Sequence, residues 1–381
     1  MKTDKQFNNK PLKELALSFL KLGTIGFGGP AAHIAMMQDV VVKKRKWMDE
    51  QHFLDLIGAT NLIPGPNSTE MAIHIGHERA GLKGLIVAGL CFILPAVIIT
   101  GIFAVLYKEY GQLPQAQPFI YGIKPAIIAI IIAAVYPLAR KSLKTVELGI
   151  IGVLALILNL IGINEIYVLF GAGFVALALA AIRNNKGNSV NSIFPFSLLQ
   201  FSGTGFLSAG GLGLFFTFLK IGAILYGSGY VLFAFLDTEL VAKGIISRQQ
   251  LIDAIAVGQF TPGPLFSSVT FIGYQINNFA GALTATIGIF LPSFLFVALL
   301  NPLVPKMRNS KLASAFLDAV NVASIAIIAA ICYKMGKDSI SEWRTIVIAV
   351  SSLAAVFGFK KINSALVVLG GAGLGYILSF L

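Results

Sequence analysis

Two stretches of this 381-residue sequence, about 200 residues apart, are similar enough to be copies of one another. Residues 19–42 read FLKLGTIGFGGPAAHIAMMQDVVV and residues 218–241 read FLKIGAILYGSGYVLFAFLDTELV, with eight of the 24 aligned positions identical. The similarity continues from 53–68 to 251–266, where a Pro-Gly-Pro tripeptide recurs, and on to a shared Leu-Pro pair. Such internal repetition predicts two similar half-proteins, and it decides the architecture before any local pattern does.

The apolar runs between these motifs place both halves in a membrane. Hydrophobic residues make up 56% of the chain and charged residues only 12%, whereas a soluble domain is about one quarter charged. Residues 84–107, 119–138 and 280–300 each reach about 20 residues, the length that crosses roughly 30 Å of hydrocarbon. With the shorter runs, we expect an all-α polytopic membrane protein of about 12–13 transmembrane segments.

The polar segments predict how the halves are joined and oriented. We expect an N-terminal repeat at 1–186, a linker at 187–211 that contains RNNKGNSVNS, and a C-terminal repeat at 212–381. The Lys-rich start, without a cleavable signal, predicts a cytoplasmic tail of a bacterial inner-membrane protein. Lysine and arginine follow different spans in the two halves, which favours inverted repeats.

The net charge of +12 is typical of cytoplasmic loops and of contacts with lipid headgroups. Its lysines and arginines are scattered between apolar spans, so we expect no nucleic-acid partner. Cys91 and Cys332 are the only cysteines and both lie in apolar stretches, which predicts neither a disulfide framework nor a metal site. The sequence leaves the oligomeric state open, with a homodimer as one possibility.

The two Pro-Gly-Pro tripeptides predict broken helices at membrane depth. Proline removes a backbone donor and clashes with the preceding turn, and irregular backbone in a bilayer is tolerated only where it is buried or lines a cavity. Each helix would restart after its break with free N–H groups, an end that suits an anion. The candidate binding residues around these restarts are Pro64, Gly65, Pro66, Asn67, Ser68, Pro262, Gly263, Pro264 and Ser267.

Glycine-rich segments and buried charges provide further candidates. Gly28, Gly29, Gly227 and Ser228 form a second pair of breaks where backbone amides could approach a ligand, although small residues also serve plain helix packing. Lys124 lies inside an apolar span and could face a dianion, or it could snorkel to the headgroups. The carboxyl groups that could carry a proton, rather than cap a helix or pair with lysine, are Asp55, Glu70 and Asp253.

Longer motifs resemble the chromate ion transporter family. WMDEQHFLDLIGATNLIPGPNSTEMAIHIGHERAG is similar to its N-terminal half, and GSGYVLFAFLDTELV with LIDAIAVGQFTPGP is similar to its C-terminal half. The resemblance spans nearly the whole chain and implies the long, fused form, with halves inserted in opposite senses and chromate exported from the bacterial cytoplasm. The second half departs from the first at three places, which implies that the first contributes more polarity: Gly229 for Pro30, Leu265-Phe266 for Asn67-Ser68, and Asn321 for Lys124.

The expected function is therefore a secondary transporter that exports chromate, driven by the membrane potential, by proton exchange, or by both. Sulfate shares the charge and shape of chromate, so we expect it to compete. Other cargoes remain open, namely sulfate, molybdate or another small anion. A membrane-bound oxyanion reductase is the alternative of a different class. It would need a cofactor site, and the glycines here lack the strand–turn–helix setting of a dinucleotide fingerprint, so we expect no cofactor and no enzyme activity.

Overall fold

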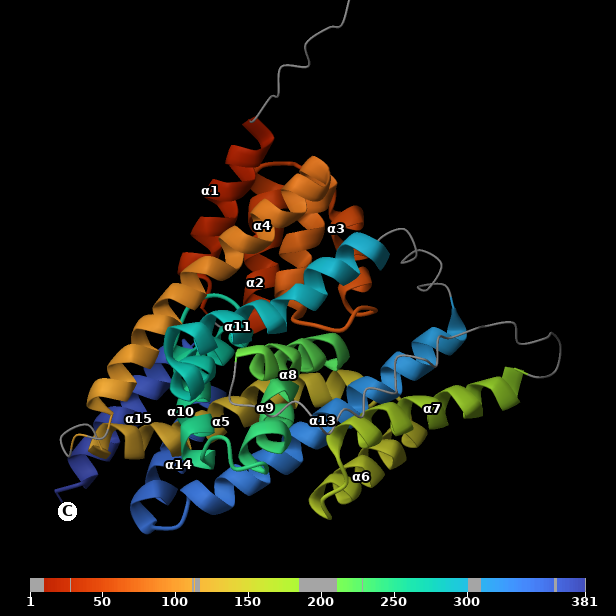
Figure 1. Cartoon of the computed structure of the whole chain (residues 1–381). Helices are drawn as coiled ribbons and strands as arrows, with labels where there is room; N and C mark the ends of the chain where they lie inside the picture. Colours follow the sequence, from red (N-terminus) through yellow and green to blue (C-terminus); the bar gives the residue numbers. More distant parts are fainter. Residues whose placement is uncertain are drawn as a thin grey trace, which may run out of the picture.

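The computed structural model describes residues 10–27, 29–111, 113, 117–184, 211–227, 229–300, 310–359 and 362–380. These residues form helices and turns, with no β-strand among them (Figure 1). The first half supplies α1 (Lys10–Ile25), α2 (Gly29–Gln38), the π-helical turn η1 (Asp39–Lys44), α3 (Glu50–Thr60), α4 (Asn67–Tyr110), α5 (Gln117–Ser142), α6 (Val146–Leu160) and α7 (Glu165–Asn184). The second half supplies α8 (Gly211–Ile224), α9 (Val231–Leu236), the π-helical turn η3 (Asp237–Val241), α10 (Arg248–Phe260), the 3₁₀ turn η4 (Leu265–Ser267), α11 (Ser268–Leu300), α13 (Lys311–Ser339), α14 (Trp343–Gly358) and α15 (Ser364–Leu378).

The two series correspond element by element, from α1 with α8 to α7 with α15. The predicted all-α architecture with two homologous repeats and broken helices is confirmed. Of the predicted linker at 187–211, the structure describes only Gly211, where α8 begins.

Local signals explain where these helices begin. The Asp49 carboxylate accepts a hydrogen bond from the His52 amide at the start of α3, at 2.8 Å. Ser247 and Gln250 form a capping box at the start of α10. Each arrangement satisfies backbone donors that have no partner within the helix. Both short helices then end just before a Pro-Gly-Pro tripeptide, because proline cannot continue them.

The long helices α4 and α11 are each interrupted at the same repeat position. Backbone angles leave the helical region at Ala80–Gly81 in α4 and at Asn277–Asn278 in α11. The two segments of α4 come together so closely that a Cβ on Gly76 would clash with the carbonyl oxygen of Gly84. An equivalent glycine pair does the same in α11. Each half therefore has a short hairpin, α3 with the first part of α4 or α10 with the first part of α11, ahead of a long crossing helix.

The two hairpins approach from opposite ends of α4. His52 lies 3.4 Å from Glu78, which places the start of α3 beside the break in α4. Lys108, at the far end of α4, donates to Asn278 in the break of α11 at 2.6 Å. The helical segment between these points is about 40 Å long at 1.5 Å per residue. This head-to-tail placement is the arrangement expected of inverted repeats.

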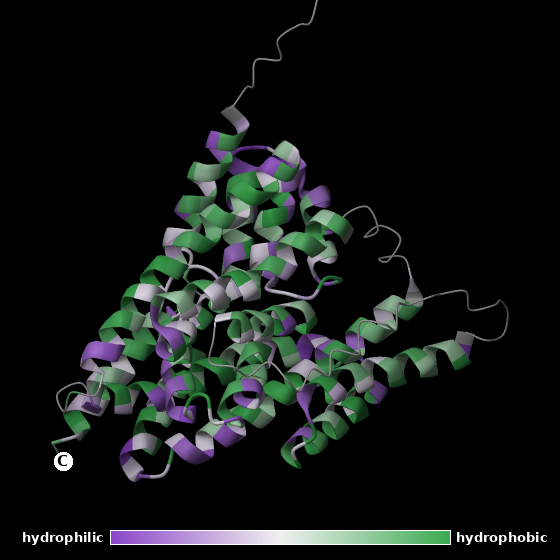
Figure 2. Ribbon diagram, viewed as in Figure 1, coloured by the Kyte–Doolittle hydropathy of each residue, from purple (hydrophilic) through white to green (hydrophobic). Residues whose placement is uncertain are grey.

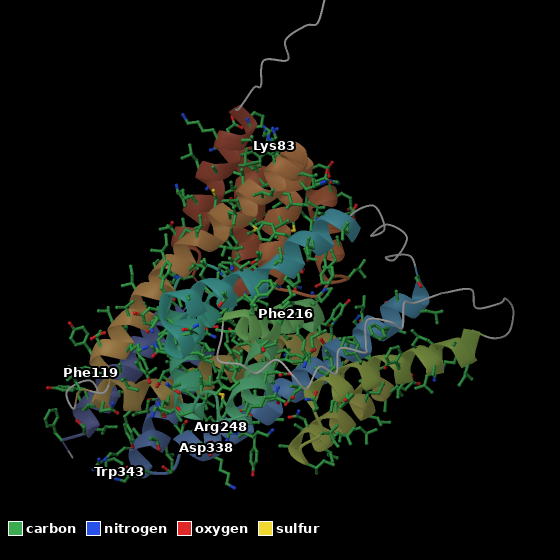
Figure 3. All side chains as sticks on the ribbon, viewed as in Figure 1. Lys83, Phe119, Phe216, Arg248, Asp338 and Trp343 are labelled. Atoms are coloured by element: carbon green, nitrogen blue, oxygen red, sulfur yellow. The ribbon has the colours of Figure 1, made fainter. Side chains whose placement is uncertain are left out.

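Charged side chains show the same opposition in Figure 3. Lys83, just after the break in α4, lies at the top of the view, whereas Arg248 and Asp338 lie near the bottom. Arg248 begins α10, the counterpart of α3, and it bonds to Asp338 at 2.8 Å. Equivalent loops of the two repeats therefore occupy opposite ends of the molecule.

The halves also exchange their peripheral helices. α6 and α7 of the first half pack on α13 of the second, while α14 and α15 of the second pack on α5 of the first. The crossing helices α4 and α11 contact each other, as do their neighbours α5 and α13. Neither half could bury its own central helices alone, so the repeats form one unit.

The outer surface is apolar, as a lipid-facing surface requires. Ile86, Leu90, Ile98 and Ile102 leave an exposed apolar stripe along α4, and the peripheral helices are coloured as hydrophobic in Figure 2. Among the described residues, five helices are long and apolar enough to span a membrane, and four shorter apolar helices accompany them. The number of transmembrane segments stays a prediction.

Candidate functional site

The first break (Pro64–Pro66) and the second break (Pro262–Pro264) meet the opposite half of the molecule. The Gly65 amide donates to the Leu225 carbonyl oxygen at 2.8 Å, and the Gly263 amide donates to the Gly26 carbonyl oxygen at 2.8 Å. Leu225 and Gly26 occupy equivalent repeat positions, each just after the first helix of its half. The two hydrogen bonds are therefore equivalent under the repeat, and each of them connects the break of one half to the backbone of the other half.

Both central glycines are required by backbone shape and by space. Gly65 has φ +139° and Gly263 has φ +91°, values that favour glycine. A Cβ on Gly65 would collide with the Glu70 carboxyl oxygen and the Ser293 hydroxyl, and one on Gly263 would lie 2.8 Å from the Ala96 Cβ. The breaks are closely packed backbone crossings in the interior of the protein.

The helices restart as expected after each break, but not identically. α4 begins at Asn67 with Pro66 as its N-cap, and the Asn67 side chain donates to Asn61 at 2.9 Å. Ser68 is buried in the first turn of α4. In the second half the turn η4 comes first, and the buried Ser267 accepts a hydrogen bond from Thr100 of α4 at 3.3 Å.

A small cavity lies beside the second break. Its volume of about 10 Å³ is room for no more than one water molecule. The Gln259 side-chain nitrogen is buried there and interacts with the Tyr230 hydroxyl, which lines the same cavity. No acidic side chain lines the cavity, whose walls are Gly29, Tyr230, Gly258, Gln259, Thr261, Gly263, Leu265 and Ser364.

The first break has a different chemical character. Glu70 lies in the first turn of α4, is fully buried, and has no hydrogen-bond partner for either carboxyl oxygen in the described part of the chain. The Ser293 hydroxyl of α11 is buried and unpartnered beside the same glycine. Tyr226, from the segment between α8 and α9, interacts electrostatically with Glu70. One break thus contains a carboxyl group, while the other borders a cavity without acids.

Asp253 and Lys124 belong to a separate cluster nearer one end. Asp253 of α10 accepts hydrogen bonds from the Tyr107 hydroxyl at 2.6 Å and from the Gln249 amide at 3.0 Å. Lys124 of α5 is half-buried and interacts electrostatically with Asp253. Asp55, the counterpart of Asp253 in α3, accepts a bond from its neighbour Gln51 at 3.2 Å. Neither Lys124 nor the two aspartates line the cavity.

The glycine segments occupy the same centre. Gly29 has φ +78° and lines the cavity, with the Tyr230 hydroxyl nearby. Gly227 has φ +94° and packs against Ser324 of α13. Gly28 and Ser228 lie outside the described residues. All the candidates around the two breaks that the structure describes therefore converge, while Lys124, Asp55 and Asp253 lie apart.

Gln259, Tyr230 and Ser293 were missed from the sequence. A signal for Gln259 existed, because both repeats carry an amide side chain three residues before Pro-Gly-Pro, Asn61 in the first and Gln259 in the second. Tyr230 and Ser293 had no such signal. Ser293 reaches the first break from the opposite half, whereas Tyr230 lines the cavity of its own half.

Comparison with known proteins identifies the family. The chromate transporter family profile matches residues 13–177 and again residues 212–376. The chain belongs to the chromate transporter family. It is 30% identical over 374 residues to the chromate transport protein of Cupriavidus metallidurans, which covers 96% of this chain and 93% of that protein. No solved structure matches the chain.

Other relatives support the long, fused form of a chromate transporter family member. The probable chromate transport protein of Synechococcus elongatus is 31% identical over 376 residues, covering 96% of this chain and 95% of that protein. The uncharacterized transporter YwrB of Bacillus subtilis is 29% identical over 161 residues, only 42% of this chain but 81% of its own length. The chain is accordingly a multi-pass bacterial membrane protein with two fused family domains.

Proposed function

We propose that this protein is a secondary transporter that exports chromate or a similar tetrahedral oxyanion, with the second break as the anion-binding site. The carrying observation is the acid-free cavity at that break, which is lined by the Gln259 amide and the Tyr230 hydroxyl. Both groups are neutral donors, and hydrogen bonds from such donors to a charged acceptor are stronger than those between neutral groups, so an oxyanion oxygen would suit them. The names of the relatives, which are chromate transport proteins, support chromate as the cargo.

The small size of the cavity implies that the transporter changes conformation when it binds the anion. A cavity of about 10 Å³ cannot hold an oxyanion, so the anion enters after the two halves separate around the breaks. The exchanged hydrogen bonds of Gly65 and Gly263 lie where that separation would begin. Rocking of inverted repeats about a midplane site is a common plan for secondary transport.

The membrane potential is sufficient to drive export. A potential of 100 mV is worth about 2.3 kcal/mol per charge, so a dianion leaving a negative interior gains about 4.6 kcal/mol. Exchange with an inward proton would add to this drive, whereas a proton that leaves with the anion would reduce it to that of one net charge, about 2.3 kcal/mol. Sulfate has the same charge and shape, so it should compete with chromate for the same donors.

The test is chromate flux in proteoliposomes that contain only this protein, under an imposed potassium-diffusion potential. We expect flux that follows the potential, that sulfate partly blocks, and that Gln259→Leu reduces about tenfold or more, the size of one lost hydrogen bond to a charged group. Gln51→Leu, on the exposed side of α3, is the matched control and should behave as wild type. Absence of chromate and sulfate flux from the folded wild-type protein would refute the proposal.

A further inference from the structure

The two breaks carry different residues at equivalent positions. Where the first repeat has Glu70, the second has Ser268, and where the second has Ser293, the first has Ala96. Glu70 and Ser293 come together at the first break, where both lie close to the position that a Cβ on Gly65 would occupy. The carboxyl–hydroxyl pair therefore exists once in the molecule, although the backbone that holds it is built twice.

Glu70 has no hydrogen-bonded cation in the described structure. Its carboxyl group has no exposed surface and no hydrogen-bond donor there. The Ser293 hydroxyl of α11 lies beside the same glycine, Gly65, and Tyr226, from the segment between α8 and α9, interacts electrostatically with the carboxyl group. His74, one turn later on α4, is buried and is the next titratable side chain on that helix. An ionised carboxylate without a donor is strongly unfavourable in such a place, so this position favours a carboxyl group that carries a proton.

We propose that Glu70 is the proton-binding site of this transporter and that its proton accompanies the oxyanion bound at the second break. This inference rests on the proposed function, because it assigns the coupling ion of the same transport centre. A carboxylate and a dianion repel each other in a poorly screened interior. A protonated Glu70 removes that repulsion, so the proton and the oxyanion bind together.

A single segment connects the two places. Leu225 accepts the Gly65 amide next to Glu70, and Tyr226 faces the Glu70 carboxyl group. Tyr230, at the other end of the same segment, lines the cavity of the second break. A charge change at Glu70 therefore acts on backbone and side chains that also shape the anion cavity.

The experiment measures proton uptake on anion binding. Sulfate is the first probe because it stays a dianion across the pH range, and chromate is the second. At pH values above the range where the free protein keeps Glu70 protonated, calorimetric titrations in buffers of different ionisation enthalpy should give about one proton taken up per anion. In that pH range the anion affinity should fall about tenfold per pH unit.

One variant tests the role of Glu70, and two further variants are its controls. Glu70→Gln should abolish proton uptake and make anion affinity independent of pH, because its amide is neutral at every pH. Glu70→Asp keeps a carboxyl group and should retain the uptake. Glu147→Gln changes an exposed carboxylate that pairs with Arg183 and should match the wild type.

The outcomes separate this inference from the proposed function. In that higher pH range, anion binding by the wild type without proton uptake, with proton release, or with uptake that survives Glu70→Gln would overturn the role of Glu70 alone. A folded wild type that binds neither anion would overturn the proposed function itself. If Glu70→Gln does not fold, infrared difference spectra decide: oxyanion binding should alter a protonated-carboxyl band in the wild type, and Glu70→Asp should shift that band. An unshifted band would overturn the role of Glu70.

Discussion

At the scale of single residues, the central glycines of the two breaks, Gly65 and Gly263, occupy the positions where a larger side chain is least tolerated. Gly65→Ala and Gly263→Ala should each destabilise the protein by at least about 2 kcal/mol, from a positive φ and a clash combined. Each should also abolish flux. Thermal unfolding in detergent, followed by flux in vesicles, measures both effects. Gly149→Ala is the control, since a Cβ there meets open space, and equal stability losses in all three variants would contradict the argument.

Lys124 and Asp253 are best tested as a pair. Asp253 already receives hydrogen bonds from Tyr107 and Gln249, and Lys124 supplies the nearby positive charge. We expect Lys124→Gln to reduce flux about tenfold, because it leaves the negative charge of Asp253 uncompensated, and that charge would repel an approaching anion. The double variant Lys124→Gln with Asp253→Asn should recover most of the flux. No recovery would instead make Lys124 a direct anion ligand.

The residues of the site were only partly predictable, for a physical reason. Local chemistry was enough to single out Pro-Gly-Pro, since no membrane helix continues through it. It was also enough to name Glu70, together with Asp55 and Asp253, as a carboxyl group that could carry a proton, because a charge at membrane depth is costly. Ser293 comes from the second repeat and reaches the first break only through the packing of the two halves, and Tyr230 lies about 30 residues before the break whose cavity it lines. Nothing in their own sequence surroundings distinguishes them from ordinary residues of an apolar span.

At the scale of elements, the interruption of α11 tests how the crossing helices are built. Asn278 has φ +47°, where the first repeat has Gly81 at φ +59°. We expect Asn278→Gly to change stability by less than about 1 kcal/mol, whereas Asn278→Val should cost at least about 2 kcal/mol, since a β-branched residue resists this conformation. Unfolding midpoints in detergent compare the two. A valine variant as stable as wild type would mean that the interruption does not need a residue that tolerates a positive φ.

Many of the helices and breaks could be predicted from the sequence because each sequence pattern occurs twice, once in each half. A pattern such as residues 53–68 is ambiguous alone, but its recurrence at 251–266 marks a short helix and a break in both halves. The interruptions at Ala80–Gly81 and Asn277–Asn278 were not predicted. Asn-Asn carries no strong helix-breaking signal, and its relation to Ala-Gly becomes clear only when the two backbones are compared.

At the scale of the whole molecule, inversion and exchange of helices create two similar centres with different chemistry. The first break holds the carboxyl group of Glu70, and the second borders the acid-free cavity. In a fully symmetric molecule the two breaks would have the same side chains and the same chemistry. Their divergence gives one molecule a place for a proton and a place for an oxyanion, joined by the segment that begins at Leu225.

The stoichiometry of transport follows from this division and can be measured as a reversal potential. If the dianion crosses alone, the reversal potential changes by about 30 mV per tenfold sulfate gradient and does not depend on pH. A dianion that crosses with one proton carries a single net charge, so the potential changes by about 59 mV per tenfold sulfate gradient and per pH unit. We expect the second behaviour in the wild type. Glu70→Gln should lose the pH dependence and approach the first, whereas a pH shift of opposite sign would indicate proton exchange.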